Sequence, residues 1–435
     1  MPFETGAEAP KKKIAVIGAG ISGMGAAYML AQDHRVVLIE SEPRLGGHAR
    51  TLISGKNGDQ PVDTGFIVFN YANYPHLAAL FDELDVPVTK SEMSFGTSID
   101  GGRVEYGLAS LDAVFAQRRN LANPRFLRMT RDIMYFNANA LRVANDNPDL
   151  TIGQFLEKLG TGDWFRDYYL LPFSGAIWST PPDKILEFPA HPLVQFFENH
   201  ALLNYSGQHQ WYTIQGGSIQ YVSRLGHAMR YRGVDVRLNA PVAAVKRSAM
   251  GVELRCHGGE WELFDEVVFA THSDVSLRLI ADPTAQERAL LGAIRYQPND
   301  VVLHADRALM PNRPKVWSSW NYTEEAGKTN DRIDLTYWMN SLQPIPKDDP
   351  LFVTLNNTQR IREELIYDQS TFDHPVFDLE AMAAQKVLAA RNGSNRTWFC
   401  GAWMKNGFHE DGLSSAVDVV EAIRVAEAPV AVAAE

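Results

Sequence analysis

A glycine-rich turn between an apolar run and a helical pattern constrains this chain more than any other feature. Residues 14–17 (Ile-Ala-Val-Ile) predict a buried parallel strand, and the pattern G-x-G-x-x-G occupies residues 18–23 directly after it. Gly18 permits a tight turn, Gly20 leaves the backbone open to a pyrophosphate, and Gly23 lets the following helix pack on the strand. The chain is therefore expected to bind a dinucleotide at this strand–turn–helix unit.

The residues around this turn are expected to hold more of the dinucleotide. Ile21 and Ser22 begin the predicted helix, where unpaired N–H groups and the helix dipole attract phosphate. A second apolar run, residues 35–39, ends at Glu40, at the spacing where a carboxylate commonly binds the ribose hydroxyls. Ser41 follows and is assigned to the same site. A chance glycine turn is the alternative, and the strand, helix and acid together disfavour it.

The composition is that of a globular protein and narrows the partners. The chain has 435 residues, which favours two domains, and it is 45% hydrophobic and 21% charged. Its net charge of -11 disfavours nucleic acid as a partner. The cysteines, Cys256 and Cys400, supply neither a disulfide framework nor a metal-ligand set. Residues 1–13 lack the apolar core of a signal peptide, and no apolar run is long enough to span a bilayer, so a cytoplasmic location is predicted.

A second pair of glycines follows the ribose acid. Gly46 and Gly47 lie close after Arg44, which suits another approach of the backbone to the same dinucleotide. With this pair of motifs the sequence resembles the flavin-containing amine oxidase superfamily, whose members bind FAD. The resemblance implies non-covalent FAD. His48 stands where that superfamily commonly has an arginine, and a phosphate contact is assigned to it.

The resemblance implies further contacts with FAD. The segment with Gly65 and Phe66 passes close to the flavin, and the backbone near Val242 meets the adenine. A helix expected to begin near Leu413 points its N–H groups at the flavin ring, where they stabilise the negative charge of the reduced ring. Ala402 stands where the superfamily usually has an acid. The C-terminal FAD contacts implied in this way are Gly401, Ala402, Gly412 and Leu413.

The fold class expected from these motifs is α/β. A discontinuous, Rossmann-like FAD-binding domain is predicted from residues 1–75, 211–275 and 391–435. A mixed α+β substrate domain of the amine oxidase type is predicted from residues 76–210 and 276–390. Within them, strands are expected at residues 88–99, 301–305, 315–321, 334–339 and 351–356, and a loop at 374–377.

Several stretches resemble a narrower group. Residues 65–70, 93–95, 177–179 and 407–413 are similar to the flavin domain at the N-terminus of plant cyclopropane fatty acid synthases and to its stand-alone bacterial relatives. This resemblance implies an oxidoreductase that acts on fatty acyl chains of phospholipids by hydride transfer to flavin N5, in desaturation or double-bond isomerisation. It also implies a methyltransferase partner of the cyclopropane-synthase type.

The candidate catalytic residues are His409 and Glu410, because their motif leads into the helix expected to face the flavin. A structural loop histidine is the alternative for His409, and a helix-start charge is the alternative for Glu410 and for Asp411. Amine oxidases hold a lysine near flavin N5, and only Lys315 and Lys405 are candidates for it here. Oxidation of a small amine, or lipid binding without catalysis, are the alternative functions.

Two further patterns concern the substrate and the surface. Aromatic residues crowd between residues 164 and 212, and we expect most of them in the core and the rest along an apolar tunnel. An amphipathic helix is predicted at residues 126–143, with arginines in and before it. These form either a solvated face or a patch for anionic headgroups, and the second interpretation predicts peripheral contact with the inner membrane surface. The arginines are Arg118, Arg119, Arg125, Arg128 and Arg131.

Overall fold

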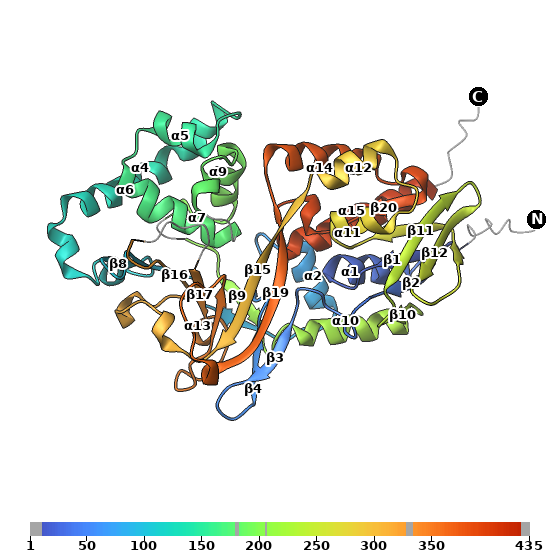
Figure 1. The fold of residues 1–435 in the computed structure, drawn as a ribbon, viewed down its shortest axis with the longest axis horizontal. Coiled ribbons are helices and arrows are strands. Elements are labelled where there is room, and N and C mark those ends of the chain that lie inside the picture. Colours follow the sequence, from blue (N-terminus) through green and yellow to red (C-terminus); the bar gives the residue numbers. More distant parts are fainter. Residues whose placement is uncertain (1–10, 179–181, 205–206, 328–333, 428–435) are drawn as a thin grey trace, which may run out of the picture.

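The computed structural model describes residues 11–178, 182–204, 207–327 and 334–427. Figure 1 shows a part built from a parallel sheet and helices, and a second part in which helices stand beside a larger sheet. Among the described residues, no helix is long and apolar enough to cross a membrane. No group of histidine, cysteine and acidic side chains in those ranges could hold a metal ion.

A five-stranded parallel sheet forms the centre of the first part. Its strand order is β10 (Asp235–Arg237), β2 (Arg35–Ile39), β1 (Lys13–Ile17), β14 (Glu266–Phe269) and β20 (Thr397–Phe399). The strands come from three separate segments of the sequence. Parallel strands covered on both faces read as continuous apolar runs, which is why β1 and β2 were recognisable in the sequence.

Helices alone cover one face of this sheet. The other face is covered by a small antiparallel sheet together with further helices. Ile14 and Val16 belong to the core shared with α1 (Ile21–Leu30), α10 (Ile219–Tyr231) and α15 (His409–Glu427). Ala15 and Ile17 belong to the opposite core, with β11 (Val242–Ser248), β12 (Gly251–Cys256), α12 (Ala285–Gly292) and α14 (Leu379–Arg391). Because successive side chains of β1 point to opposite faces of the sheet, this one strand contributes to both cores.

A seven-stranded mixed sheet organises the second part. Its strand order is β19 (Ile366–Val376), β15 (Arg295–His304), β18 (Phe352–Leu355), β17 (Asp334–Trp338), β16 (Trp320–Thr323), β7 (Phe95–Ile99) and β8 (Val104–Gly107). The neighbours are antiparallel, except that β16 and β7 are parallel. The long pair β15 and β19 runs through the middle of the molecule between the two parts (Figure 1).

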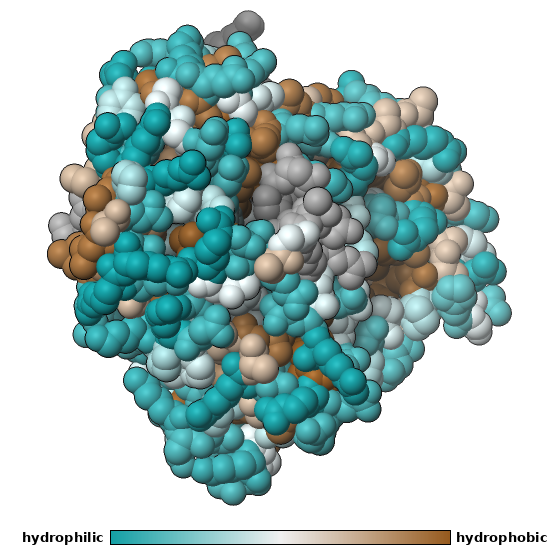
Figure 2. Space-filling model, turned by 60° about the vertical axis from the view of Figure 1, so that its left-hand side comes forward, coloured by the Kyte–Doolittle hydropathy of each residue, from teal (hydrophilic) through white to brown (hydrophobic). Residues whose placement is uncertain are grey.

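Helices stand beside this sheet. They are α3 (Leu111–Val114), α4 (Pro124–Asn145), α5 (Ile152–Leu159), α6 (Asp163–Phe165), α7 (Leu171–Trp178), α8 (Pro182–Ile185) and α9 (Ala190–Asn199). The aromatic-rich region supplies much of their core, including Phe165, Tyr169 and Phe197. Figure 2 brings this side of the molecule forward and shows hydrophobic surface in separate areas among hydrophilic residues.

Smaller elements complete the described chain. They are β3 (Thr51–Ser54), β4 (Gln60–Asp63), β5 (Val68–Phe69), α2 (Pro75–Glu83), β6 (Val88–Ser91), β9 (Trp211–Ile214), β13 (Glu262–Phe264), α11 (Ser273–Leu279) and α13 (Met339–Leu342). The α/β fold class predicted from the sequence is confirmed. The domain boundaries at individual residues stay a prediction.

Four expectations about local structure were wrong. The strand expected at 88–99 is divided between two sheets, because β6 pairs with β9 whereas β7 pairs with β8 and β16. At 315–321 a short 3-10 turn, Pro314–Val316, precedes β16. The loop expected at 374–377 continues β19, where Pro375 is tolerated because this strand lies at the sheet edge. Helix α15 begins at His409 rather than near Leu413, and the side chain of Asp411 accepts the backbone N–H of Phe408.

Candidate FAD and substrate site

One large cavity of about 1060 Å³ collects most of the residues predicted from the sequence. It begins at the carboxyl ends of β1, β2 and β14, where ligands of open α/β sheets bind, and extends to the seven-stranded sheet and α7. The predicted FAD contacts on its wall are Gly18, Gly20, Ile21, Ser22, Glu40, Ser41, Gly46, Gly47, His48, Gly65, Phe66, Val242, Gly401 and Ala402.

The glycines of the first turn are glycines for different structural reasons. Gly18 has a φ of +98°, and a Cβ on it would lie 2.9 Å from the carbonyl oxygen of Ala270. A Cβ on Gly23 would lie 1.8 Å from the carbonyl oxygen of Gly18. A Cβ on Gly20 would meet no atom within 4 Å, so Gly20 faces open space in the cavity. Gly18 and Gly23 are thus required by the protein, whereas Gly20 leaves room for a ligand.

The second glycine pair packs directly on the first turn. A Cβ on Gly47 would lie 3.0 Å from the Cα of Gly20, and the N–H of Gly46 donates to the carbonyl of Ala19 at 2.8 Å. Arg44 supports this loop from outside the cavity wall, because its guanidinium donates to the carbonyl of Gly47 at 2.8 Å and to another carbonyl of the loop. Arg44 thus has a supporting role in the loop, and its predicted contact with FAD stays a prediction.

Glu40 lies on the cavity wall at the end of β2. Its carboxylate accepts the N–H of Ala19 at 2.6 Å and the N–H of Glu42 at 2.9 Å. These bonds fix the carboxylate beside the glycine turn, in the position expected for a ribose ligand. The N-terminus of α1 follows this turn, and Gly20 provides no side-chain cap for it. The first N–H groups of α1 are therefore placed to bind phosphate.

The remaining predicted FAD residues lie behind the wall. Gly23 packs on the first turn, and a Cβ on Gly412 would lie 2.9 Å from the hydroxyl of Ser22. Leu413 is buried between α15 and α1, beside Gly25. Because α15 begins at His409, Leu413 belongs to its second turn and packs in the core rather than at the helix end.

His409 lines the cavity as a partly buried, neutral side chain. Its ring stacks on Phe66 with the centroids 3.9 Å apart, and its Nε2 shares a hydrogen bond of 2.7 Å with the hydroxyl of Tyr221. Burial lowers the pKa of His409 to about 3. A ring with this pKa is a weak proton acceptor, so the geometry favours a role in holding Phe66. Its predicted catalytic role stays a prediction.

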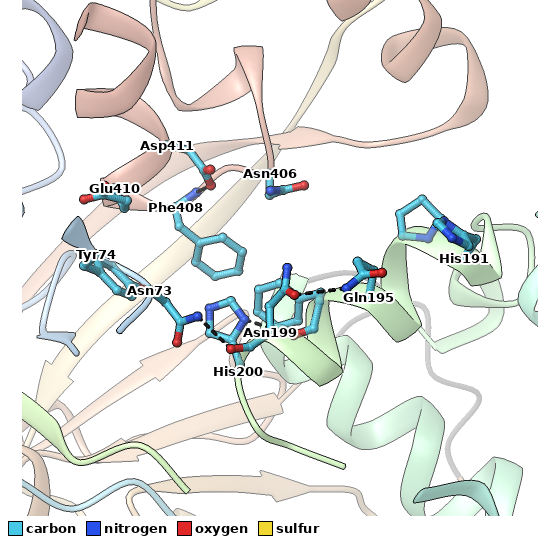
Figure 3. Close-up of a pocket in the computed structure, with 12 residues that line it drawn as sticks. Asn73, Tyr74, His191, Gln195, Asn199, His200, Asn406, Phe408, Glu410 and Asp411 are labelled. Atoms are coloured by element: carbon cyan, nitrogen blue, oxygen red, sulfur yellow. Dashed lines mark hydrogen bonds between the residues drawn. The ribbon is translucent and has the colours of Figure 1, made fainter. Parts of the chain in front are cut away.

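Glu410 points away from the large cavity. Its carboxylate accepts the N–H groups of His76 and Leu77, both at 2.9 Å, and so caps the N-terminus of α2. Figure 3 shows Glu410 beside Tyr74 in a smaller neighbouring pocket of about 340 Å³, with the ring of Phe408 pointing the other way, toward His200. The structure thus gives Glu410 a capping role on α2 that the sequence did not indicate, and its predicted catalytic role stays a prediction.

A cluster of histidines on the cavity wall was missed by the sequence analysis. The ring centroid of His48 lies 5.8 Å from that of His272 and 5.9 Å from that of His374. Burial lowers the pKa of His48 to about 3 and that of His374 to about 4, and it also lowers the pKa of His272. His272 lies three residues after the end of β14, so its position beyond the carboxyl end of an apolar parallel strand was a usable signal.

The hydrogen bonds around His374 fix its tautomer. The amide oxygen of Asn299 accepts from Asn356 at 2.7 Å, so the Asn299 nitrogen is the group that donates to Nδ1 of His374 at 3.0 Å. The neutral ring then carries its proton on Nε2. In the same cluster, Nε2 of His48 is buried without a protein partner in the described ranges. The cluster therefore offers polar ring atoms to a ligand at the cavity wall.

The far end of the cavity is apolar. Side chains from the seven-stranded sheet, from α7 and from neighbouring segments form this region, which we call the apolar arm. Its members are Met93, Phe95, Leu108, Phe173, Ile177, Val301, Trp320, Tyr337, Leu342 and Leu355. The arm opens from the same cavity as the glycine turns. A dinucleotide site and an apolar binding site are thus continuous.

The comparisons with known proteins agree with this geometry. The family described as flavin containing amine oxidoreductase matches residues 21–407. The chain belongs to this family. Its glycine turns, Glu40 and the uncapped N-terminus of α1 fit FAD, and the protein is an FAD-dependent oxidoreductase.

This oxidoreductase is also similar to individual proteins. L-amino acid oxidase Lm29 of Lachesis muta is 44% identical over 48 residues, which are 11% of this chain and 9% of that protein. A fatty acid isomerase of P. acnes has a TM-score of 0.67 at 15% identity, with 94% of this chain and 98% of the other covered. Cyclohexylamine oxidase of Brevibacterium oxydans has a TM-score of 0.64 at 16% identity, with 95% and 100% covered. At such low identity, these structures show a shared fold only.

The oxidoreductase departs from the amine oxidase pattern at its lysines. Lys315 pairs with Asp112 on the surface, and Lys405 binds the Ser414 hydroxyl and the Asp418 carboxylate. Neither lysine is on the described cavity wall. Cys400 follows β20 and is fully buried, and its burial raises its pKa to about 12, so it is no attachment point for a flavin. The burial of Cys400 is consistent with non-covalent binding of FAD.

Proposed function

We propose that this oxidoreductase acts on the fatty acyl chains of ester lipids such as phospholipids. The observation that carries this proposal is the apolar arm, which continues from the FAD site between the sheets. Aromatic and aliphatic walls with few polar groups bind an extended hydrocarbon by removing its surface from water, at about 25 cal/mol per Å².

The charges on the cavity wall favour an uncharged, esterified chain. Glu92 and Asp373 lie on this wall with the histidines that burial keeps neutral. A free fatty acid would bring its carboxylate toward these acidic side chains, whereas an ester carries no charge there. The headgroup of a phospholipid would remain at the cavity mouth. A cyclopropane-synthase-type methyltransferase partner stays a prediction, and it is supported only by the narrower resemblance.

The chemistry needs little from the protein beyond orientation. When bound, FAD supplies an acceptor for the hydride that leaves an acyl carbon. The arm would orient the chain, Phe66 and its stacking partner His409 would form one side of the reacting region, and closure around the chain would exclude water. Desaturation also needs an acceptor for a proton from the neighbouring carbon, whereas isomerisation returns the hydride to the same chain.

The test is the visible spectrum of the purified protein under anaerobic conditions. An unsaturated phospholipid should bleach the flavin bands, or give a shifted double bond by lipid analysis without net bleaching. The same chain presented as a free acid should react less. Neither bleaching nor a new lipid product with a panel of unsaturated phospholipids would overturn the proposal.

Oxidation of an amine is a second candidate, favoured by the family and by Glu92 and Asp373, whose carboxylates would attract an ammonium group. The same spectrum decides between the two. Bleaching by a small amine such as putrescine, and not by phospholipid, would select this candidate.

A further inference from the structure

The outer face of α4 combines arginines with large apolar side chains. Leu127, Met134 and Tyr135 are 41%, 58% and 47% exposed, and Arg131 lies between them at helical spacing. The opposite face is buried against the helical core through Phe126, Met129, Phe136 and Ala140. This 22-residue helix is therefore amphipathic, but its outer face is not simply polar.

The arginines on this face are poorly balanced by acids. Asp132 is the carboxylate of α4, and it is turned inward, where its side chain is 5% exposed and accepts the N–H of Gly162. Arg128 and Arg131 contact Asp132 from outside, yet their side chains remain 59% and 72% exposed. Arg125 is exposed as well. A positive surface thus stands on a chain whose net charge is -11.

The surface continues toward the cavity. Leu121, in the 3-10 turn Arg118–Ala122 before α4, is 53% exposed. Leu111 begins α3 and is 80% exposed, and the exposed Ala109, two residues earlier, belongs to the wall of the large cavity. Ring contact between Phe115 and the buried face of α4 ties these elements together. Exposed apolar side chains thus occur on α4, before it and on α3, and the segment before α3 reaches the cavity wall.

We propose that this region is a docking surface for a lipid bilayer that carries anionic headgroups. The α4 surface is defined by Leu121, Arg125, Leu127, Arg128, Arg131, Met134 and Tyr135. Interfacial helices insert aliphatic and aromatic side chains at the level of the acyl chains while arginines pair with the headgroups. Nucleic acid would use the arginines and leave the apolar side chains in water, so the combination favours a membrane.

This proposal does not depend on the acyl-chain substrate. Vesicle binding by the FAD-loaded protein is measured without turnover, by co-sedimentation with vesicles of phosphatidylcholine alone or mixed with phosphatidylglycerol. We expect binding to the mixed vesicles that weakens as salt is raised, since each basic residue near an anionic surface contributes about 1 kcal/mol, or roughly fivefold in affinity.

Two variant pairs separate charge from apolar contact. Arg125→Glu with Arg131→Glu should reduce binding to mixed vesicles more than tenfold, while the matched reversals Arg288→Glu and Arg391→Glu on α12 and α14 should leave it unchanged. Leu127→Asp with Met134→Asp should also weaken binding, whereas Met250→Asp, at a still more exposed turn, should not. An unchanged flavin spectrum and circular dichroism would show that each variant is folded.

The outcomes are distinct. Binding that both α4 variants leave intact, or equal binding to uncharged vesicles, would overturn the docking surface. Binding to RNA or heparin that depends on the arginines but not on Leu127 and Met134 would replace it with a polyanion site. Vesicle binding together with neither flavin bleaching nor a new lipid product would keep the docking surface and overturn the acyl-chain substrate.

Discussion

The glycine cradle and the apolar arm lie in one cavity but are specified in different ways. The cradle is made by backbone within short stretches, where a missing Cβ decides whether the chain can turn or a ligand can approach. The arm is made by side chains from β7, α7, β15, β16, β17 and β18, which are far apart in the sequence. A local site tolerates almost no change of backbone, whereas a dispersed site should lose its ligand before it loses its fold.

The largest expected effect separates two glycines of the cradle. Gly23→Ala would place a Cβ 1.8 Å from a backbone oxygen, so we expect no stable, flavin-loaded protein. Gly20→Ala meets no protein atom, and its apoprotein should unfold at the wild-type temperature while binding FAD at least roughly tenfold more weakly. Thermal unfolding of apoprotein and flavin titration measure both. Equal destabilisation by the two variants would break the distinction between turn and ligand space.

A charged substitution in the apolar arm tests whether a dispersed site loses its ligand while the fold is kept. Ile177→Asp should retain FAD and the fold but lower kcat/KM for a phospholipid by about 100-fold, because burying a carboxylate beside the chain costs several kcal/mol. Ile53→Asp, at an exposed strand position, is the control. Flavin content and lipid turnover are measured on both. Wild-type turnover with Ile177→Asp would remove the arm from the substrate site.

The lowered pKa of His409 predicts a dependence of stability on pH. Its folded pKa of about 3 lies below its ordinary value, so the unfolded chain gains a proton that the native ring does not as pH falls below about 6.5. This group alone should cost about 1.4 kcal/mol of unfolding free energy per pH unit between about pH 6 and 4. His409→Phe should remove that share of the slope in urea unfolding at several pH values. Parallel wild-type and variant slopes would contradict a neutral His409.

The smallest effect decides whether Glu410 is structural. Glu410→Gln removes the charge that caps α2, which should cost about 1 kcal/mol of stability and leave lipid turnover within about twofold. Glu421 is exposed on α15, the helix that carries Glu410, and Glu421→Gln should change neither stability nor turnover. Urea unfolding and turnover are compared for the three proteins. A large loss of turnover at unchanged stability would restore Glu410 as a catalytic residue.

The parts that could be predicted are those with a local cause. The first turn, Glu40 and the second glycine pair lie on the cavity wall as expected, because each belongs to a short unit with its own geometry. His374 was misplaced because a histidine before a proline reads as a loop, and only the edge position of β19 makes that proline acceptable. The capping contact of Glu410 could not be predicted, because its partners on α2 are more than three hundred residues away.

The sequence by itself determined that this chain binds FAD in a family fold, since strand, glycine turn and helix are consecutive and their steric requirements are local. The tertiary structure decided what surrounds the flavin: which histidines meet at the wall, which acid caps a helix, and which apolar side chains form the arm. These depend on contacts between distant segments, whose free energies act only once the two sheets have brought them together.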